Sequence, residues 1–354
     1  MSRFLHPQYA GLEAYTPGEQ PRDQQYIKLN TNESPYPPAP AVLAALTEQD
    51  LADLRLYSDP EGTALRAKLA ELYGVEAGQV FLSNGSDDIL NFAFMAFGAD
   101  GAVFPALTYS FYPVFANLHG VAYETVPLRE DFTLDVAGMQ GKGKLTVFPN
   151  PNAPTGIALP LDQVEAIVAA NPDHVVVVDE AYVDFGADSA VPLLQRYENL
   201  LVVMTYSKSR SMAGARLGFA LGSRTLIQDL EKLKYSTNPY NVNRLTLKLG
   251  QAAVDSDGYF REKAREIMAT RERTARALRA LGFTLPDSQA NFLFVAHPKV
   301  AGETLYRKCK EKGVLIRHFS DPAIAAYNRV TIGTPAEMEA FLAVVQTILK
   351  EEGA

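Results

Sequence analysis

The sequence predicts an α/β fold: a large domain with a mostly parallel central sheet flanked by helices, and a smaller α+β domain near the C-terminus. Short valine-rich runs alternate with segments of helical periodicity, which is typical of parallel strands covered by helices on both faces. After Asn241 the pattern changes to one long charged helix followed by shorter elements. We expect residues 46–245 to form the large domain and residues 246–354 the interdomain helix and the small domain. Prolines in residues 1–45 predict an extended arm that completes the small domain.

The large domain begins with a clear helix at residues 63–73, because Gly74 follows it as a typical C-terminal stop. Apolar runs and periodic segments alternate after that helix. The remaining predicted elements are strands at 80–83, 101–104, 145–148, 174–178, 200–204 and 218–222, with helices at 87–97 and 161–170.

The small domain is predicted from helix 258–281 onward. Its other elements are a strand at 291–295, a helix at 301–312, strands at 314–317 and 329–332, and a final helix. Thr334 and Glu337 form the pattern of a capping box, and Pro335 occupies the first helical position. The start of the last helix is therefore well defined.

Composition excludes several classes of protein. The 354 residues carry a net charge of −8 without a basic run, which argues against nucleic-acid binding. No apolar run approaches the roughly 18 residues of a membrane span, and the N-terminus lacks the pattern of a signal peptide. Cys309 is the single cysteine, and the five histidines are scattered. We expect a cytoplasmic protein that holds no metal and no internal disulfide.

One segment imitates the phosphate loop of a nucleotide triphosphatase. The spacing from Gly138 through Gly143 to Lys144 nearly matches that loop. Leu145, however, stands where a magnesium-binding Ser or Thr is required, and the segment precedes a predicted strand instead of following one. An ATPase is therefore not predicted.

A different set of residues matches what pyridoxal phosphate (PLP) requires. Lys208 follows the strand at 200–204 and supplies an amine for the cofactor aldehyde. Asp179 ends the strand at 174–178, where a carboxylate can keep the pyridine nitrogen protonated, and Tyr182 can donate to the ring oxygen. Each has a structural alternative: a solvated lysine, a helix N-cap and a core tyrosine.

The phosphate group requires N–H donors and a cation. The segment at residues 83–88 runs from a predicted strand into a helix, whose backbone amides and dipole favour an anion, with plain N-capping as the structural alternative. Ser207 and Arg216 complete this predicted phosphate site. Tyr109 is predicted to stack on the cofactor ring, although a core aromatic fits the same spacing.

These motifs resemble the fold-type-I, class I/II aminotransferases, and among them the histidinol-phosphate aminotransferase family. The resemblance extends over essentially the whole chain. Its motifs lie at residues 15–18, 30–35, 57–60, 84–87, 150–156, 179–182, 207–208 and 328–334. The lysine and Pro-Thr-Gly motifs are shared by many aminotransferases, whereas the arm and the segment at Tyr57 are narrower.

The resemblance implies roles for individual residues. Lys208 binds the cofactor and moves the substrate proton, and Asn152 joins Tyr182 at the ring oxygen. Within the segment at residues 83–88, Gly85, Ser86 and Asp87 are the members that hold the phosphate. Arg329 binds the substrate anion. The other substrate-binding residues that the resemblance implies are Tyr15, Asn32, Tyr57 and Asn152. Tyr57 also reaches the cofactor phosphate of a neighbouring subunit, which implies a homodimer. Many relatives have asparagine directly before Pro-Thr-Gly, but this chain has Ala153.

The implied reaction transfers the amino group of L-histidinol phosphate to 2-oxoglutarate, a step of histidine biosynthesis. An aromatic amino acid is an alternative donor, because pockets discriminate weakly between rings of similar size. A related PLP-dependent decarboxylase of a phosphorylated substrate is a second alternative. A non-catalytic regulatory protein would be expected to have a DNA-binding segment or to lack Lys208, and the sequence shows neither feature.

Overall fold

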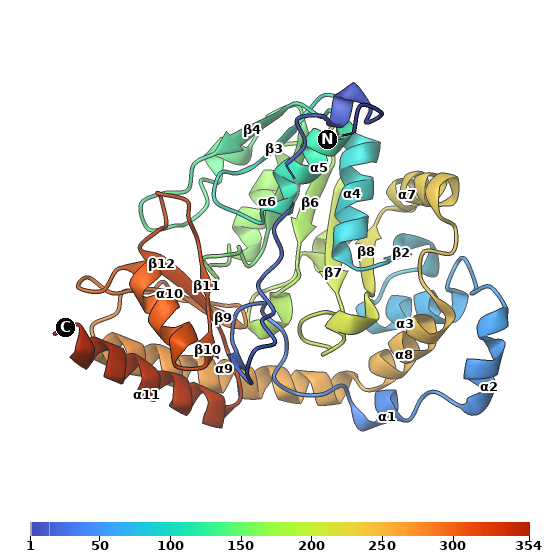
Figure 1. Cartoon of the computed structure of the whole chain (residues 1–354). Coiled ribbons are helices and arrows are strands. Elements are labelled where there is room, and N and C mark those ends of the chain that lie inside the picture. The colour runs from blue at the N-terminus through green and yellow to red at the C-terminus, as the bar shows by residue number, and fades with distance from the viewer. Residues whose placement is uncertain (1, 14) are drawn as a thin grey trace.

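A seven-stranded sheet forms the centre of the larger part of the molecule (Figure 1). The computed structural model describes residues 2–13 and 15–354. The strand order is β2-β8-β7-β6-β5-β3-β4, with β8 antiparallel to both neighbours and the other pairs parallel. The strands are β2 (Val80–Ser83), β3 (Ala102–Pro105), β4 (Tyr123–Val126), β5 (Leu145–Pro149), β6 (Val176–Asp179), β7 (Leu200–Thr205) and β8 (Gly218–Gly222). The predicted, mostly parallel sheet is confirmed.

Helices cover both faces of this sheet and form a separate apolar core on each. One face packs against α4 (Ser86–Phe97), α5 (Phe111–His119) and α7 (Arg224–Thr237). The other face packs against α3 (Thr63–Tyr73), α6 (Leu161–Ala169) and α8 (Arg244–Asp255). Double coverage explains why every residue of the five inner strands and of the edge strand β2 is buried, so that these strands read as continuous apolar runs.

The smaller part of the molecule contains a three-stranded antiparallel sheet in the order β11-β12-β9. Its strands are β9 (Phe292–Ala296), β11 (Arg317–His318) and β12 (Tyr327–Thr331), and its helices are α9 (Asp257–Ala280), α10 (Gly302–Glu311) and α11 (Pro335–Glu351). The capping box of Thr334 and Glu337 is present at the start of α11. The long α9 runs beneath both parts of the molecule (Figure 1).

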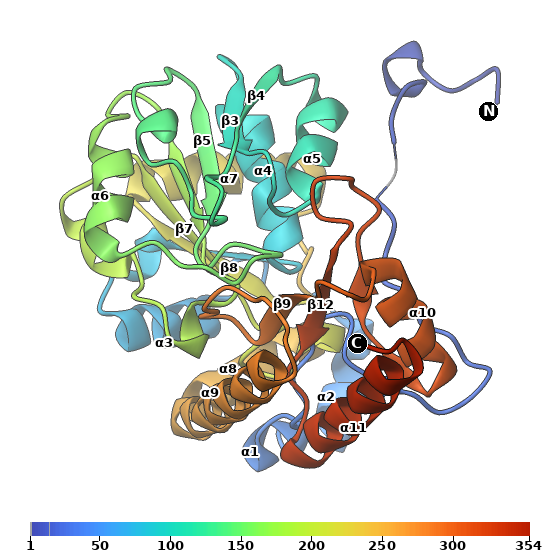
Figure 2. The same cartoon turned by 90° about the vertical axis from the view of Figure 1, so that its left-hand side faces the viewer.

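The N-terminal arm adds a strand to this smaller part. Strand β1 (Ile27–Lys28) pairs in parallel with β10 (Val314–Leu315). Residues near the N-terminus stand away from the body of the molecule (Figure 2). The arm thus completes the smaller unit as expected, while the boundaries at residues 45 and 245 remain predictions.

The predicted strand at 314–317 is wrong as a single element. Val314–Leu315 pairs with β1, whereas Arg317–His318 pairs with β12 in another sheet. The chain therefore changes partners at Ile316. Apolar periodicity alone does not show such a change, because both halves are equally compatible with a strand.

The sequence patterns also missed several elements. Strand β4 lies at the sheet edge and buries only Val126, so it lacks a continuous apolar run. Two short helices in the arm region, α1 (Pro40–Leu43) and α2 (Glu48–Ala52), and the helices α5, α7 and α8 were not predicted either. Strand β1 was not predicted as a strand, only as part of an extended arm. Apart from β10 and β11, the remaining strands and α-helices lie within one or two residues of their predicted positions.

Candidate active site

Two adjoining cavities lie beyond the carboxyl ends of the parallel strands. The larger has a volume of about 540 Å³ and the smaller about 170 Å³. Both are lined by Thr31, Tyr109, Ala153, Tyr182 and Lys208. Open α/β sheets bind ligands at this edge, because side chains that follow neighbouring parallel strands converge there.

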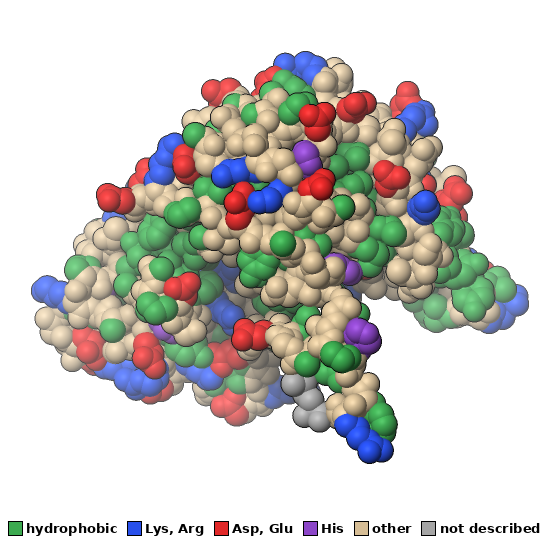
Figure 3. Space-filling view, turned by 90° about the horizontal axis from the view of Figure 1, so that it is seen from above, with side chains coloured by type: hydrophobic (Ala, Val, Ile, Leu, Met, Phe, Trp, Pro, Cys, Tyr) green, Lys and Arg blue, Asp and Glu red, His purple; other side chains and the backbone are tan. Residues whose placement is uncertain are grey.

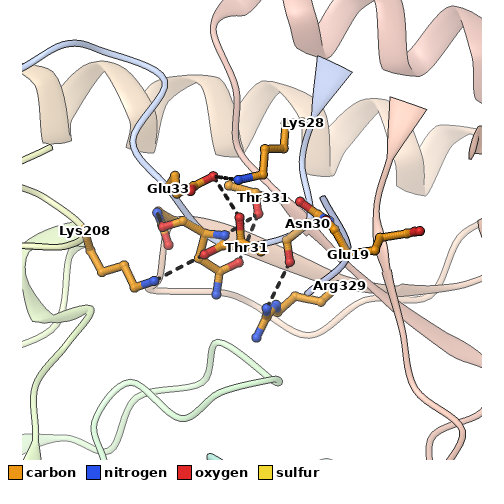
Figure 4. Close-up of polar contacts among 10 residues, drawn as sticks. Glu19, Lys28, Asn30, Thr31, Glu33, Lys208, Arg329 and Thr331 are labelled. Atoms are coloured by element: carbon orange, nitrogen blue, oxygen red, sulfur yellow. Dashed lines mark hydrogen bonds and ion pairs between the residues drawn. The ribbon is translucent and has the colours of Figure 1, made fainter. Parts of the chain in front are cut away.

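Lys208 lies between the two cavities. It follows β7 by three residues, and its Nζ lies 3.3 Å from the backbone oxygen of Thr31 in the arm. The same Nζ lies 5.7 Å from the centre of the Tyr182 ring. Figure 4 shows Lys208, in the loop that follows β7, extending toward the arm segment at Thr31. A solvated surface lysine would not be held in this way.

Asp179 ends β6 and lies on the wall of the smaller cavity, where it is 4% exposed. Its Oδ2 accepts a hydrogen bond of 3.0 Å from the Tyr112 hydroxyl, and its Oδ1 accepts one of 3.2 Å from the Ala181 amide. Burial raises the pKa of the Asp179 carboxyl to about 6, although these two donors and Lys208 favour its ionised form.

The predicted phosphate residues come together at one end of the smaller cavity. Ser86, Asp87, Ser207 and Arg216 all line it. Arg216 donates to Asp87 at 3.1 Å and to Ser207 at 3.4 Å. The first turn of α4 begins beside them at Ser86. Backbone amides of a helix N-terminus and a guanidinium provide the donors that a phosphate dianion needs.

Gly85 leaves room for this arrangement. Its φ of +84° is in the region that favours glycine, and an added Cβ would lie 2.7 Å from Nη2 of Arg216. A side chain here would therefore displace the guanidinium. The lysine, the buried carboxylate and this phosphate site together fit PLP in the smaller cavity.

Two further tyrosines, Tyr109 and Tyr15, line the walls of the larger cavity. Tyr109 lines both cavities and donates to Asp87 at 2.7 Å. Burial and the nearby Asp87 raise the pKa of Tyr109 well above its usual value, so its hydroxyl remains a donor. Tyr15 lines the larger cavity and stacks on Phe111 with ring centres 4.2 Å apart.

Arg329 on β12 lines the larger cavity but not the smaller one. It donates to the Asn30 backbone oxygen at 3.2 Å and lies over the Phe292 ring. Within the part of the chain that the structure describes, its buried Nε has no hydrogen-bond partner. Burial lowers the pKa of Arg329 from its usual value. A half-buried guanidinium whose Nε donor is unused is suited to a bound anion.

The arm forms one wall of the site and links the two halves of the chain. Asn32 donates to the Tyr182 hydroxyl at 2.9 Å and exchanges hydrogen bonds with Thr331, its backbone amide at 2.9 Å and its side-chain oxygen at 3.0 Å. Asn291 donates to the Asn32 backbone oxygen at 3.0 Å. Figure 4 shows this segment between Lys208 and Arg329, with each side chain bonded to one of its carbonyl oxygens.

Residues 24–345 match a family model described as "Aminotransferase class I and II". The chain belongs to this aminotransferase family. A curated histidinol-phosphate aminotransferase of Brachyspira hyodysenteriae is 48% identical over 99% of this chain and 100% of its own length. One from Bordetella parapertussis is 49% identical over 98% of this chain and 99% of its own length.

One similar solved structure contains the cofactor PLP. The histidinol-phosphate aminotransferase of Sinorhizobium meliloti, in complex with PLP, superposes on this aminotransferase with a TM-score of 0.88. The two sequences are 25% identical, and the match covers 99% of this chain and 98% of the other. The predicted fold-type-I architecture is confirmed.

The structure does not bring Asn152 to the cofactor cavity of the aminotransferase. Its amide donates to the Leu107 backbone oxygen and to the Thr155 hydroxyl, and its Oδ1 accepts from Thr108. Ala153 lines both cavities instead, whereas Asn152 lines neither of them. The predicted contact of Asn152 with the ring oxygen is therefore corrected, because its amide is already occupied by the neighbouring loop.

Tyr57 also lies outside both cavities. It is 78% exposed and stacks on Tyr240 with ring centres 4.5 Å apart. A single chain of this aminotransferase therefore does not bring Tyr57 to its own Lys208. This position is compatible with a role in a neighbouring subunit.

Sequence reasoning missed three residues of the site. Thr31 bonds Lys208 through a backbone oxygen, which no side-chain pattern reveals. Arg317 lines the larger cavity with Arg329, and an isolated arginine before a loop gave no signal. Tyr112, which bonds Asp179, lies in an aromatic stretch that is typical of a core helix. Only its spacing of three residues from Tyr109 could have indicated that both reach the same site.

Within residues 2–13 and 15–354, no cluster of three or more His, Cys, Asp or Glu side chains is arranged to hold a metal ion. Over the same residues, no helix combines the length and apolar character needed to cross a membrane.

Proposed function

We propose that this aminotransferase uses PLP to transfer the amino group of L-histidinol phosphate to 2-oxoglutarate, giving imidazole-acetol phosphate and L-glutamate. The observation that carries the proposal is that Lys208 and Arg329 both line the larger cavity, one as an amine and the other as a half-buried guanidinium. The names of relatives that match almost the full chain support the same substrate and cofactor.

The residues of the smaller cavity would hold the cofactor. Bound PLP supplies an electron sink for the bond between the substrate Cα and its hydrogen. Asp179 would keep the ring nitrogen protonated, Tyr182 would donate to the ring oxygen, and Tyr109 would pack against the ring. Ser86, Ser207 and Arg216 would hold the phosphate, together with the backbone amides of Gly85 and Asp87. Lys208 Nζ would take the proton from the substrate Cα and deliver it to C4′ of the cofactor.

Arg329 would bind the anionic end of each substrate in turn. Histidinol phosphate carries a phosphate and 2-oxoglutarate carries a carboxylate, and a planar guanidinium binds either group through paired N–H donors. Arg317 lines the same cavity and adds a second positive charge. Tyr15 and Asn32, both in the arm, close the other side of the substrate site.

The half-reaction tests the substrate. Purified, PLP-loaded protein is mixed separately with L-histidinol phosphate, L-phenylalanine and L-glutamate, and the cofactor absorbance is followed in time. We expect fast conversion at low histidinol phosphate and much slower conversion with phenylalanine. Equal or faster conversion by phenylalanine would instead identify an aromatic aminotransferase. Absence of conversion by all three would favour the decarboxylase alternative.

We also propose that the active form is a homodimer in which Tyr57 reaches the partner's cofactor phosphate. Exposed apolar side chains cluster in sequence around Tyr57, namely Leu43, Leu51, Leu54 and Leu56. Figure 3 shows hydrophobic side chains at the edge of the molecule that holds α2. Apolar surface of this kind commonly marks an interface between proteins.

A subunit-mixing experiment tests the shared site. Lys208→Ala and Tyr57→Ala proteins are unfolded together, refolded and assayed. In a mixed dimer one site carries both substitutions and the other carries neither. We therefore expect activity to return in the mixture to about a quarter of wild type if subunits pair at random. Activity no greater than that of the two separate variants would contradict the shared site.

A further inference from the structure

Tyr112 is a tyrosine of α5 that the aminotransferase buries completely. Its ring packs against Phe104 and Tyr109, with ring centres 5.8 Å away in each case. Packing from several sides leaves the ring one orientation. The hydroxyl then points at Asp179, to which it donates at 3.0 Å.

This hydrogen bond leaves Asp179 with one donor on each oxygen. The Ala181 amide bonds Oδ1 at 3.2 Å, and Tyr112 bonds Oδ2. The carboxylate is thus fixed in rotation as well as position, while it still lines the smaller cavity. Each carboxylate oxygen accepts more than one hydrogen bond, so capacity remains for a donor in the cavity.

Four groups determine the charge of Asp179. Tyr112 from α5 and the Ala181 amide donate to it, and both favour the ionised form. Lys208 favours that form through its charge, whereas Asp87 from α4 opposes it. Burial and the nearby Asp179 carboxyl raise the pKa of Tyr112 well above its usual value, so Tyr112 remains a neutral donor. The hydroxyl therefore counteracts the effect of burial on Asp179.

We propose that Tyr112 is a positioning residue that holds Asp179 ionised and oriented toward the ring nitrogen of the cofactor. Tyr109, one turn away on the chain, bonds Asp87 in the same manner. The loop before α5 and its first turn thus bond two carboxylates of the cofactor site, and the ring nitrogen requires only Asp179 in ionised form. The proposal rests on the role proposed for Asp179 and is independent of the substrate.

The test compares PLP binding by the apoprotein of wild type, Tyr112→Phe and Tyr206→Phe between pH 5.5 and 9. Tyr206 is a matched control, because it is also fully buried and, among the described residues, its hydroxyl has no hydrogen-bond partner. Dissociation constants are measured by equilibrium dialysis. Circular dichroism establishes that each variant is folded.

Loss of the hydroxyl should favour the neutral carboxyl. Suppose that Tyr112→Phe raises the midpoint for ionisation of the Asp179 carboxyl by about one pH unit. The Kd of this variant for PLP is then about threefold that of wild type at pH 6.5 and nearly equal to it at pH 9. Tyr206→Phe should match wild type throughout. A Kd for Tyr112→Phe that equals wild type at every pH, or one raised equally at every pH, would overturn the proposal. A Tyr112→Phe protein that does not fold would indicate a structural role and overturn it as well.

A double-mutant cycle supplies a second measurement that does not involve the cofactor. The free energy of unfolding is measured for Tyr112→Phe, Asp179→Asn and the double variant at pH 8. Direct contact predicts that the two substitutions are non-additive. Additive effects would contradict the contact. Unchanged PLP binding by Asp179→Asn alone would instead contradict the proposed role of Asp179, so the two failures are distinguishable.

Discussion

Asp179 and Glu180 are neighbouring carboxylates with different surroundings. Asp179 lines the cofactor cavity, whereas the buried Glu180 accepts hydrogen bonds from the Ser189 hydroxyl at 2.6 Å and the Ala190 amide at 2.5 Å. Burial raises the pKa of Glu180 to about 8, although both donors oppose this rise. Glu180 therefore remains largely protonated at neutral pH and secures the loop at Ser189.

Glu180 should make the stability of the apoprotein depend on pH. Its folded pKa of about 8 lies above the usual 4.5, so the folded state holds this proton more tightly. Its contribution to the free energy of unfolding is full below pH 4.5 and is lost as pH rises to 8. The free energy of unfolding in urea is measured for Glu180→Gln and for wild type. The difference between them should change by a few kcal/mol in favour of the variant as the pH rises from 5 to 8.5. A constant difference between the two proteins would contradict this expectation.

Arg329→Ala should weaken the binding of both anionic substrates by about 2 to 5 kcal/mol, because the buried anion loses its paired donors. The measurement is the concentration dependence of the half-reaction with histidinol phosphate and with glutamate. Binding of PLP should be unchanged, which serves as the control. Unaltered affinity for glutamate would exclude Arg329 as its partner.

Asn152→Ala should affect stability more than cofactor binding. The substitution removes the donors to the Leu107 oxygen and the Thr155 hydroxyl and the acceptor for Thr108. We expect the free energy of unfolding to fall by about 1 to 3 kcal/mol, with the spectrum of the bound cofactor unchanged. A shifted cofactor spectrum with normal stability would restore the original prediction for Asn152.

Among single residues, the sequence identified those with a chemical signature. Lys208, Asp179 and Arg216 lie where strand ends and a Gly-rich segment predict them. The choice between Asn152 and Ala153 was not predictable, because a shift of one residue turns the side chain away from the cavity. Tyr112 was not predictable either, since a bonded tyrosine and a packed one occur in the same apolar pattern.

At the scale of elements, the beginning of α4 is the most sensitive point of the predicted phosphate site. Gly85→Ala introduces a Cβ close to Arg216 at a φ of +84° and a ψ of 169°, which is nearly restricted to glycine. We expect PLP affinity to fall at least tenfold and stability to fall by about 1 to 3 kcal/mol. Gly74→Ala is the control, because Gly74 also has a positive φ but an added Cβ meets nothing within 4 Å. Equal PLP affinity in both variants would contradict the prediction.

Elements buried on both faces were predictable because their sequences are continuously apolar. The strands from β5 to β8 are examples, and each is fully buried. Strand β4 shows the limit of this signal, since it buries only Val126 and therefore lacks a continuous apolar run. The division between β10 and β11 shows another, because strand partners depend on residues far away in the sequence.

At the scale of the whole molecule, the proposed dimer should depend on the apolar surface around Tyr57. Leu54 is 55% exposed in the single chain, so Leu54→Asp should have little effect on its folding. In a dimer the Leu54→Asp substitution would bury a charge at the interface. We therefore expect this variant to become monomeric and to lose most of its activity. Light scattering after gel filtration measures the mass. Met95→Asp, at an exposed position on α4, is the control, and an unchanged dimer with Leu54→Asp would exclude this surface.

The hydrogen bonds between Asn32 and Thr331 join residues 299 positions apart in the chain. During synthesis, the arm and Lys208 are made long before Thr331 and Arg329. A growing chain can therefore complete its central sheet while the arm still lacks its partners. A complete substrate site therefore requires that β12 has been made, and a chain truncated before β12 should retain the sheet without ever acquiring a complete site.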